Sequence, residues 1–257
     1  LFRPSFHGWE NLPEGPVLMV CNHSGGGGIE VLGLAMMWNE EFGDQRPVTG
    51  MAHPMAWYLP GPDMTVKAFG AVPSTYAHGE RALAQGVPTI IFPGGDHDAF
   101  RPFWHAKKVD FNGRKGFLKL ARRAWVPIVP MGIYGSHFTA PMLWRSKLLA
   151  WLLVVPRAMG LKRFPVTLLG VLGVLLILWL MGPTVGWGWA ALTSALWCIT
   201  PIAIFIPILP WRIRVCMGPA IAPEQLFGDR DEDMPLDDAY VRVVSEIRRL
   251  VHEAADR

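Results

Sequence analysis

The chain has 257 residues, a length that can bury a full core and that predicts one domain over residues 1–257. Hydrophobic residues make up 51% of it and charged residues only 18%, a balance too apolar for an ordinary soluble enzyme, so a membrane must be considered. Cys21, Cys198 and Cys216 are odd in number and lie among apolar neighbours, which argues against a disulfide framework and a structural zinc site.

The first part of the chain alternates buried strands with helices. Short apolar runs at 16–21, 87–92 and 126–131 are typical of strands in a parallel sheet, and segments with helical spacing lie between them, at 29–38, 76–85 and 117–124. This order predicts an α/β fold with a mostly parallel central sheet flanked by helices. The chain opens without the basic and apolar regions of a signal peptide, so none is expected.

The last part of the chain predicts one more strand, at 212–217, and a closing amphipathic helix. After an acidic turn at 229–233, apolar residues recur three and four positions apart from Leu236 to Val251. Pro235 suits the first turn of that helix.

Residues 164–211 form a long segment without a single charged residue. Its first arm, 166–181, is short for a full membrane span, and glycines and a proline at 182–188 interrupt the run. Basic residues flank both ends of the segment, which predicts a hydrophobic membrane hairpin inserted in the domain, with both ends and the catalytic face cytoplasmic. The tryptophans at 179, 187, 189, 197 and 211 suit an interfacial belt, and the alternative is a helical pair buried in a soluble core.

The sequence "VCNHSGGGGIE" places His23 where a strand of the parallel sheet ends and the next helix begins. Ligand sites of α/β folds assemble at this edge. Glycines there let backbone approach a ligand and leave N–H groups free, and Glu30 is an acid that could orient the imidazole. The pair predicts a general base.

A second polar cluster, "FPGGDHDAFRP" at 92–102, follows the next strand of the same kind. Gly94 and Gly95 could hold a phosphate whose charge Arg101 or Lys107 would balance. Metal binding by the histidines and aspartates of this stretch is a minor alternative, and no nucleotide-binding loop or nucleic-acid recognition pattern is present.

Asn22-His23 followed by an acid, then "FGAVPS" (69–74), then "FPGGDHDAFRP", then "VPIVP" (126–130), resembles the four sequence blocks of the PlsC-type glycerolipid acyltransferases, especially their mono- and diacylglycerol acyltransferase-like branch. The resemblance implies a glycerol-3-phosphate acyltransferase-like fold. It also implies that His23 removes a proton from an acceptor hydroxyl, which attacks acyl-CoA or acyl carrier protein without a cofactor. The acceptor would be a glycerolipid or lysophospholipid, taken from membrane lipids.

In the family, four residues usually separate the histidine from an aspartate, and Gly28 occupies that position here. The resemblance therefore leaves Glu30 as the partner of His23, with Asp98 as a second candidate. The blocks imply a wider set of substrate-binding residues: Asn22, Ser24, Gly25, Val72, Pro73, Gly94, Gly95, Asp96, His97, Arg101, Lys107 and Pro127.

The second block differs from the family in a way that bears on the acceptor. Members often carry an arginine directly after the Val-Pro pair to hold an acceptor phosphate, whereas Ser74 and Thr75 follow Pro73 here. A neutral glycerolipid, or a phosphate held by Arg101 and the basic stretch after it, is expected instead. Two other readings stay open: an inactive lipid-binding relative, and a lipid esterase that uses "HSGGGG" as an oxyanion loop.

Overall fold

The computed structural model describes residues 4–25, 29–53, 57, 62–68, 70–153, 157, 162–200, 203–204, 206–228 and 235–257. Gly28, Phe69 and the acidic turn at 229–233 lie outside these residues.

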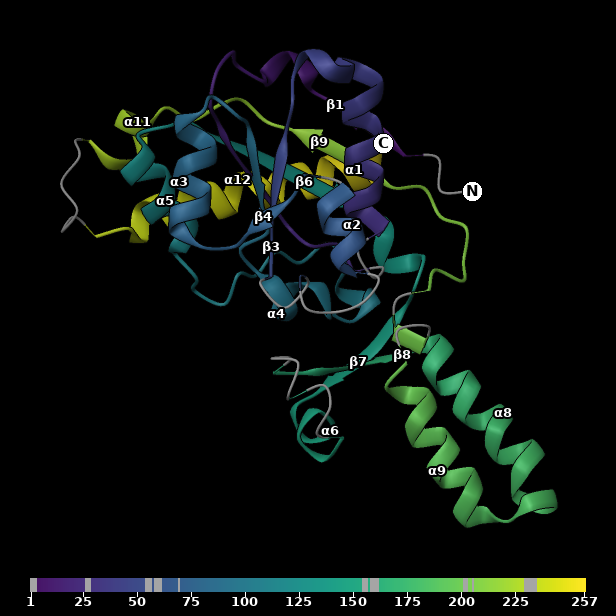
Figure 1. The fold of residues 1–257 in the computed structure, drawn as a ribbon. Helices are drawn as coiled ribbons and strands as arrows, with labels where there is room; N and C mark the ends of the chain where they lie inside the picture. The colour runs from purple at the N-terminus through teal and green to yellow at the C-terminus, as the bar shows by residue number, and fades with distance from the viewer. Residues whose placement is uncertain are drawn as a thin grey trace.

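One seven-stranded sheet forms the centre of the molecule, in the order β1-β9-β6-β2-β5-β3-β4 (Figure 1). All neighbouring strands run parallel except β6 and β9, which are antiparallel. The strands are β1 (Ser5–His7), β2 (Leu18–Cys21), β3 (Thr49–Ala52), β4 (Val72–Pro73), β5 (Thr89–Ile91), β6 (Ile128–Tyr134) and β9 (Arg214–Met217). The predicted α/β class and mostly parallel sheet are confirmed.

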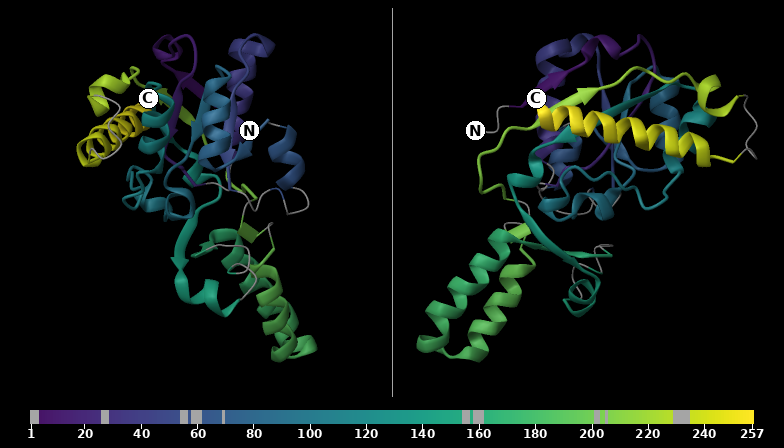
Figure 2. Two further views of the ribbon diagram at one scale, coloured as in Figure 1. Left: turned by 60° about the vertical axis from the view of Figure 1, so that its left-hand side comes forward. Right: turned by 180° about the vertical axis from the view of Figure 1, so that it is seen from behind.

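Helices cover both faces of this sheet, and Figure 2 shows α1 and α12 on opposite sides. Leu18 and Val20 of β2 face the core under α3, α5 and α12, whereas Met19 and Cys21 face the core under α1, as the alternation of a strand requires. The helices of the central unit are α1 (Ile29–Phe42), α2 (Pro62–Ala68), α3 (Tyr76–Ala84), α4 (Gly95–Ala99), α5 (Gly116–Ala124), α11 (Pro223–Phe227) and α12 (Asp237–Asp256), with 3₁₀ turns η1 (Trp9–Asn11), η3 (Gly43–Gln45), η5 (Phe103–His105) and η6 (Ser136–Phe138).

The predicted elements fall close to these bounds, with small differences at their ends. The closing helix begins at Asp237, so Pro235 precedes it instead of lying in its first turn. The short strands β1, β3 and β4 were not predicted, because runs of two to four residues carry too little alternation to stand out.

A second unit projects from the carboxyl edge of the sheet, beyond α4 (Figure 1). It contains the antiparallel pair β7 (Met142–Ser146) and β8 (Phe164–Thr167), the short helix α6 (Lys147–Leu152), and a helical hairpin of α8 (Leu168–Val185) and α9 (Trp187–Cys198). The two ends of the hairpin meet, since the Thr167 hydroxyl donates to the Ala203 carbonyl. The predicted hairpin is therefore present, although Val166 and Thr167, which the prediction placed in its first arm, belong to β8.

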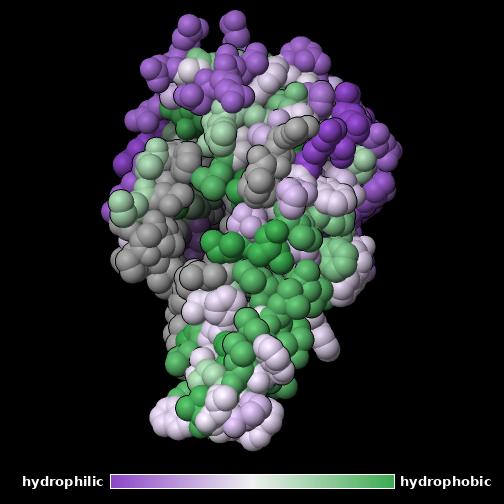
Figure 3. Space-filling model, turned by 90° about the vertical axis from the view of Figure 1, so that its right-hand side faces the viewer, coloured by the Kyte–Doolittle hydropathy of each residue, from purple (hydrophilic) through white to green (hydrophobic). Residues whose placement is uncertain are grey.

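The hairpin is exposed and apolar, and Figure 3 shows hydrophobic side chains over its surface. By length and composition alone, α8 is the one helix of the described residues that could cross a membrane, with a mean hydropathy of 2.3 and 11% of its window buried. This exposure contradicts the alternative of a helical pair buried in a soluble core.

The turn of the hairpin lies at Gly186, with φ 101°, within the predicted interruption at 182–188, whereas Gly182 and Pro183 still belong to α8. Pro183 falls in the last turn of α8, where a missing N–H costs one hydrogen bond, and the helix continues through it. Trp197 also differs from the predicted belt: its indole donates to the Gly170 carbonyl at 3.1 Å, so it packs between the two helices.

Candidate active site

β2 ends at Cys21, two residues before the histidine, and Asn22 between them holds the chain in register with β6. The Asn22 amide donates to the Ile133 carbonyl at 2.9 Å and accepts from the Ile133 N–H at 2.8 Å. A side chain therefore continues the hydrogen-bond ladder one step past the strand. Asn22 is completely buried, so it is a support for His23 and not the substrate contact that was predicted.

His23 forms a dyad with Glu30 from the first turn of α1. The imidazole Nδ1 lies 3.0 Å from Glu30 Oε1. Glu30 is 1% exposed and the His23 side chain 20% exposed, so the carboxylate is sheltered while the ring reaches the surface. The Phe92 ring stacks on the imidazole with centroids 4.3 Å apart. With Nδ1 directed at the carboxylate, the second ring nitrogen is left to act as a base.

Ser136, which sequence analysis did not identify, supports the carboxylate from the turn after β6. Its hydroxyl lies 3.4 Å from Glu30 Oε2 and contacts the Ser24 hydroxyl. Ser24 and Ser136 are fully buried, so Ser24 is part of this network and not a substrate contact. The sequence signal was the same as for His23, namely polar residues directly after a buried strand ("YGSHF", 134–138).

Asp98 and Arg101 hold the backbone of His23 instead of its ring. The His23 N–H donates to Asp98 Oδ2 at 2.6 Å, and Arg101 donates to the His23 carbonyl at 3.1 Å. Arg101 also pairs with Asp98. Burial raises the pKa of Asp98 above the ordinary aspartate value, although Arg101 and His23 favour its charged form. The second candidate acid thus fixes where His23 lies, while Glu30 contacts the imidazole.

This arrangement corrects the predicted role of Arg101. Its side chain is 3% exposed and its guanidinium is directed at Asp98, the His23 carbonyl and His137, so it does not face a substrate phosphate. An arginine with these partners can be buried in the interior. The sequence does not distinguish such a buried arginine from the exposed lysines and arginines around it.

His137 completes the support behind Arg101. Its Nε2 lies 3.2 Å from an Arg101 nitrogen, and its ring lies beside Gly25, where an added Cβ would come within 3.1 Å of His137 Cδ2. Gly25 also has φ +81°, so both its backbone conformation and its close packing against His137 favour a glycine. Burial, Arg101 and His23 lower the pKa of His137 well below 6.5, so it is neutral at pH 7.

The glycine pair of the second cluster packs against side chains. An added Cβ at Gly94 would lie 2.2 Å from the Asp98 Cβ, and one at Gly95, where φ is +48°, would lie 2.7 Å from an Arg114 nitrogen. Arg114 donates to the Gly94 carbonyl at 2.8 Å and to Asp96 at 3.1 Å. The Gly95 N–H bonds to the Phe92 carbonyl at 3.2 Å, which corrects the phosphate cradle for this residue.

His97 belongs to α4 and its side chain is buried. Its Nε2 lies 3.0 Å from Asp110 Oδ2, and its carbonyl accepts a hydrogen bond from Arg145 of β7. The predicted substrate contact is therefore a structural link between the central unit and the projecting unit.

The remaining predicted contacts lie away from His23. Pro127 precedes β6, and its carbonyl accepts from the Leu18 N–H at the start of β2, so it lies at the opposite edge of the sheet from the dyad. Val72 and Pro73 form β4, at the same edge as His23 but three strands away. Distance in the sheet, which a linear motif does not encode, separates these residues from the dyad.

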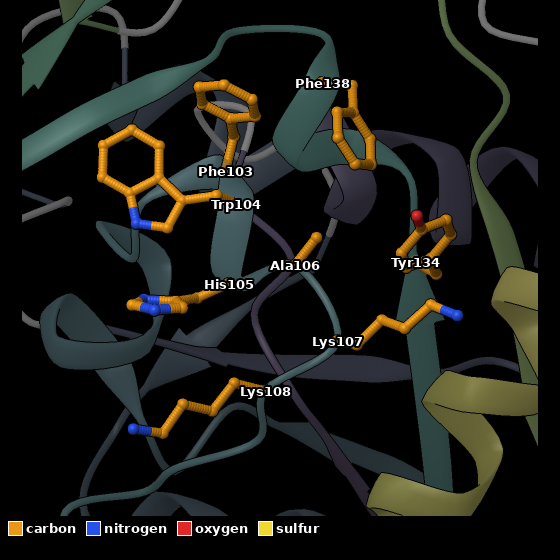
Figure 4. Close-up of a pocket in the computed structure, with 8 residues that line it drawn as sticks. All are labelled: Phe103, Trp104, His105, Ala106, Lys107, Lys108, Tyr134 and Phe138. Atoms are coloured by element: carbon orange, nitrogen blue, oxygen red, sulfur yellow. The ribbon is translucent and has the colours of Figure 1, made fainter.

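A pocket of about 430 Å³ opens near the carboxyl end of β6 (Figure 4). Phe103 and Phe138, on two of its walls, closely follow Arg101 and His137 in the chain. The lining combines aromatic rings with two ammonium groups, from Phe103, Trp104, His105, Ala106, Lys107, Lys108, Tyr134 and Phe138. Lys107 is therefore placed in an aromatic and basic pocket, where it also pairs with Asp256 at 3.4 Å.

Among the described residues, no three histidine, cysteine or acidic side chains come together as a metal site. The chemistry available at the dyad is proton transfer by a histidine that a buried carboxylate orients.

An α/β sheet with a carboxylate-oriented histidine at its carboxyl edge defines a class of proteins that can activate a hydroxyl for attack. A sequence model described as Acyltransferase matches residues 3–134, more than half of this chain, and the chain belongs to the acyltransferase family. The fold is similar to the crystal structure of the 1-acyl-sn-glycerophosphate (LPA) acyltransferase PlsC from Thermotoga maritima, with a TM-score of 0.55 and 15% identity, over 100% of this chain and 73% of that one.

Curated relatives match between about half and two thirds of the chain. An uncharacterized protein of Mycobacterium tuberculosis (strain ATCC 25618 / H37Rv) is 34% identical over 167 residues, which cover 65% of this chain and 45% of the relative. The "DGAT1/2-independent enzyme synthesizing storage lipids" of Gallus gallus is 33% identical over 126 residues, 49% of this chain and 36% of the relative. The chain thus spans less than half the length of these relatives.

Proposed function

We propose that this protein is a membrane-bound O-acyltransferase that moves a fatty acyl group from a thioester donor, acyl-CoA or acyl carrier protein, to the hydroxyl of a lipid acceptor. The observation that carries the proposal is the 3.0 Å contact between His23 Nδ1 and the buried Glu30 carboxylate at the ligand-binding edge of the sheet. Membership in the acyltransferase family supports the reaction class.

The dyad supplies the proton transfers of this reaction. Glu30 accepts a hydrogen bond from Nδ1–H, and Nε2 removes the proton of the acceptor hydroxyl. The hydroxyl oxygen attacks the thioester carbonyl carbon, an ester bond forms and the carbon–sulfur bond breaks. The imidazolium returns its proton to the departing thiolate, so no acyl-enzyme is required. Glu30 stabilises the imidazolium while it exists.

The acceptor that the site favours is a neutral lipid alcohol. A phosphate on the acceptor would need a free cation near His23, yet Ser74 and Thr75 stand after Pro73, and the guanidinium of Arg101 is buried against Asp98. The chicken relative is described as synthesizing storage lipids, and a 27% identical relative in Arabidopsis thaliana is described as a phytyl ester synthase, names that agree with such an acceptor.

The pocket of Figure 4 is the candidate site for the carrier part of the donor. Trp104 and the other rings offer stacking surfaces for a nucleotide base, while Lys107 and Lys108 offer charge for its phosphates. An acyl-CoA donor fits this lining better than a donor without a nucleotide.

The hairpin is the candidate membrane anchor. At about 1.5 Å per residue, α8 extends about 27 Å and α9 about 18 Å, against a hydrocarbon core of about 30 Å, so the pair suits entry into the bilayer with return to the same side. Cysteine labelling at positions 162 and 214 is expected to report one side, the cytoplasmic one. Labelling from opposite sides would contradict the hairpin topology.

The function is tested by incubating the purified protein, in phospholipid vesicles, with acyl-CoA and a panel of acceptors, followed by lipid mass spectrometry. The panel contains monoacylglycerol, diacylglycerol, a long-chain alcohol and lysophosphatidate, with the His23→Ala variant as the control. We expect esters of the neutral acceptors from the wild-type protein alone. Equal product from the His23→Ala variant, or hydrolysis without transfer, would sink the proposal.

A further inference from the structure

Outside the hairpin, residues 144–152 expose large apolar side chains that the catalytic unit does not cover. Trp144 of β7 and Leu148, Trp151 and Leu152 of α6 are between 58% and 70% exposed. We refer to these four residues as the β7–α6 patch. Contiguous apolar exposure of this kind on a monomer marks an interaction surface.

The opposite side of α6 is already packed. Ala150 lies in a small core with Phe164 of β8 and Ile204, and Cys198 at the end of α9 packs against the same core. The helix is therefore fixed at the base of the hairpin, and both views of the ribbon place it beneath the central sheet on the side from which the hairpin projects (Figures 1 and 2). Its exposed residues are held in place and are not part of a frayed end.

The charge of this region is of one sign. Between Asp110 and Glu224 the sequence contains no aspartate or glutamate. Along the chain the patch is flanked instead by the basic residues Lys147, Arg157, Lys162 and Arg163, while the Arg145 guanidinium turns back to the His97 carbonyl. Tryptophan and leucine side chains beside unopposed lysines and arginines match the interfacial layer of an anionic bilayer, in which rings lie at headgroup depth and cations meet phosphates.

We propose that the β7–α6 patch is a second bilayer-binding surface, which lies in the headgroup layer of an anionic leaflet beside the point where the hairpin enters it. The proposal relies on the proposed function only for the presence of a bilayer next to the hairpin. A second copy of the chain fits less well, because two such surfaces would bring their uncompensated positive charges together.

A consequence for the reaction follows from Arg145. This residue adjoins Trp144 in the chain, and its guanidinium donates to the His97 carbonyl of α4, the helix that also carries Asp98. Contact of the patch with lipid thus fixes the height and tilt of the turn that holds His23. A hairpin alone would leave the catalytic unit free to swivel about its base.

The test uses the full chain in phosphatidylglycerol-containing vesicles, with Cys198→Ala as background and one environment-sensitive fluorophore on an engineered cysteine. The label is placed at Trp151 in the patch, at Leu175 in α8, or at Val241 on α12, three positions that are all strongly exposed. Lipids with a quencher near the headgroup or deep in the acyl chain report contact and depth. We expect strong quenching at 151 by the shallow quencher, quenching at 175 by the deep one, and none at 241.

Quenching at 151 no stronger than at 241 would overturn the patch proposal, whatever position 175 reports. A blue-shifted but unquenched label at 151 would identify a protein partner or a second copy in place of lipid, and would overturn it as well. Quenching at 151 without quenching at 175 would support the patch and contradict the hairpin anchor of the proposed function, so the two failures are distinguishable.

Discussion

The catalytic edge and the projecting unit place their side chains by opposite rules. At the edge, the buried polar residues Asn22, Glu30, Asp98 and Arg101 each meet a partner within the protein. In the projecting unit, large apolar residues such as Trp151 and Trp179 face outward. Polar groups in the interior need internal partners, and apolar groups at the surface need an external one. Substitutions at the edge should therefore change activity or stability whether or not lipid is present, and those in the projecting unit should change activity only when lipid is present.

The largest expected effect is the loss of the ion pair behind His23. Arg101→Met leaves the Asp98 carboxylate buried without its cation, which costs about 3–5 kcal/mol of unfolding free energy. Denaturant unfolding measures it. The double variant Asp98→Asn/Arg101→Met is the matched control and should recover part of the loss. Full stability of Arg101→Met would contradict the internal partnership on which the comparison rests.

His23→Ala is expected to lower turnover roughly 100-fold or more, because the general base is removed. Circular dichroism and vesicle binding should stay unchanged, since the His23 side chain is partly exposed and only its backbone is held by Asp98 and Arg101. Near wild-type turnover would end the proposed mechanism.

Glu30→Gln should lower kcat by roughly ten-fold or more with little change in KM, because the glutamine neither fixes the tautomer of His23 nor stabilises the imidazolium. Glu30→Asp should also be impaired, since the shorter side chain does not span the 3.0 Å contact from α1. The comparison variant is Asp98→Asn, whose main expected defect is in stability. If Asp98→Asn abolished turnover in a folded protein and Glu30→Gln did not, the two acids would have to exchange roles.

His137 predicts a pH dependence of stability. Its pKa is depressed in the folded state, so below the ordinary value of 6.5 the unfolded chain binds more protons than the folded one. The free energy of unfolding should then fall as the pH drops below 6.5, by up to about 1.4 kcal/mol per pH unit. Thermal or urea unfolding at pH 7.5, 6.5 and 5.5 should show a shallower slope for His137→Gln than for wild type. His252→Gln, at an exposed position of α12, is the control, and equal slopes for all three proteins would remove His137 as the cause.

The smallest expected effect belongs to the β7–α6 patch. Leu148→Ser/Trp151→Ser should lower transfer to an acceptor within vesicles several-fold, and should leave transfer to a short-chain acceptor in detergent unchanged. Val241→Ser, which alters an apolar residue 61% exposed on α12, should change neither rate. Equal losses in vesicles and detergent would mean that the patch acts on the fold of the catalytic unit and not through lipid.

The sequence alone determined the features that depend on local pattern. Short apolar runs placed β2, β5 and β6, and a further strand pattern placed β9. Helical spacing of apolar residues placed α1, α3, α5 and α12, and an uncharged stretch placed the hairpin, because burial leaves a local apolar pattern in the residues that undergo it. His23 and Glu30 were also identified, since a strand end followed by glycines and an acid at the start of a helix are features of one short stretch.

Only the tertiary structure decided the roles that depend on distant partners. It assigned Asp98 and Arg101 to the backbone of His23, brought Ser136 and His137 beneath the dyad from another strand, and put Pro127 at the far edge of the sheet. It also showed α8 continuing through Pro183 to a turn at Gly186. A polar side chain is satisfied by whichever group folding places within about 3 Å of it. For Asn22 and Ile133 that group lies 111 residues away in the chain, where no local period records it.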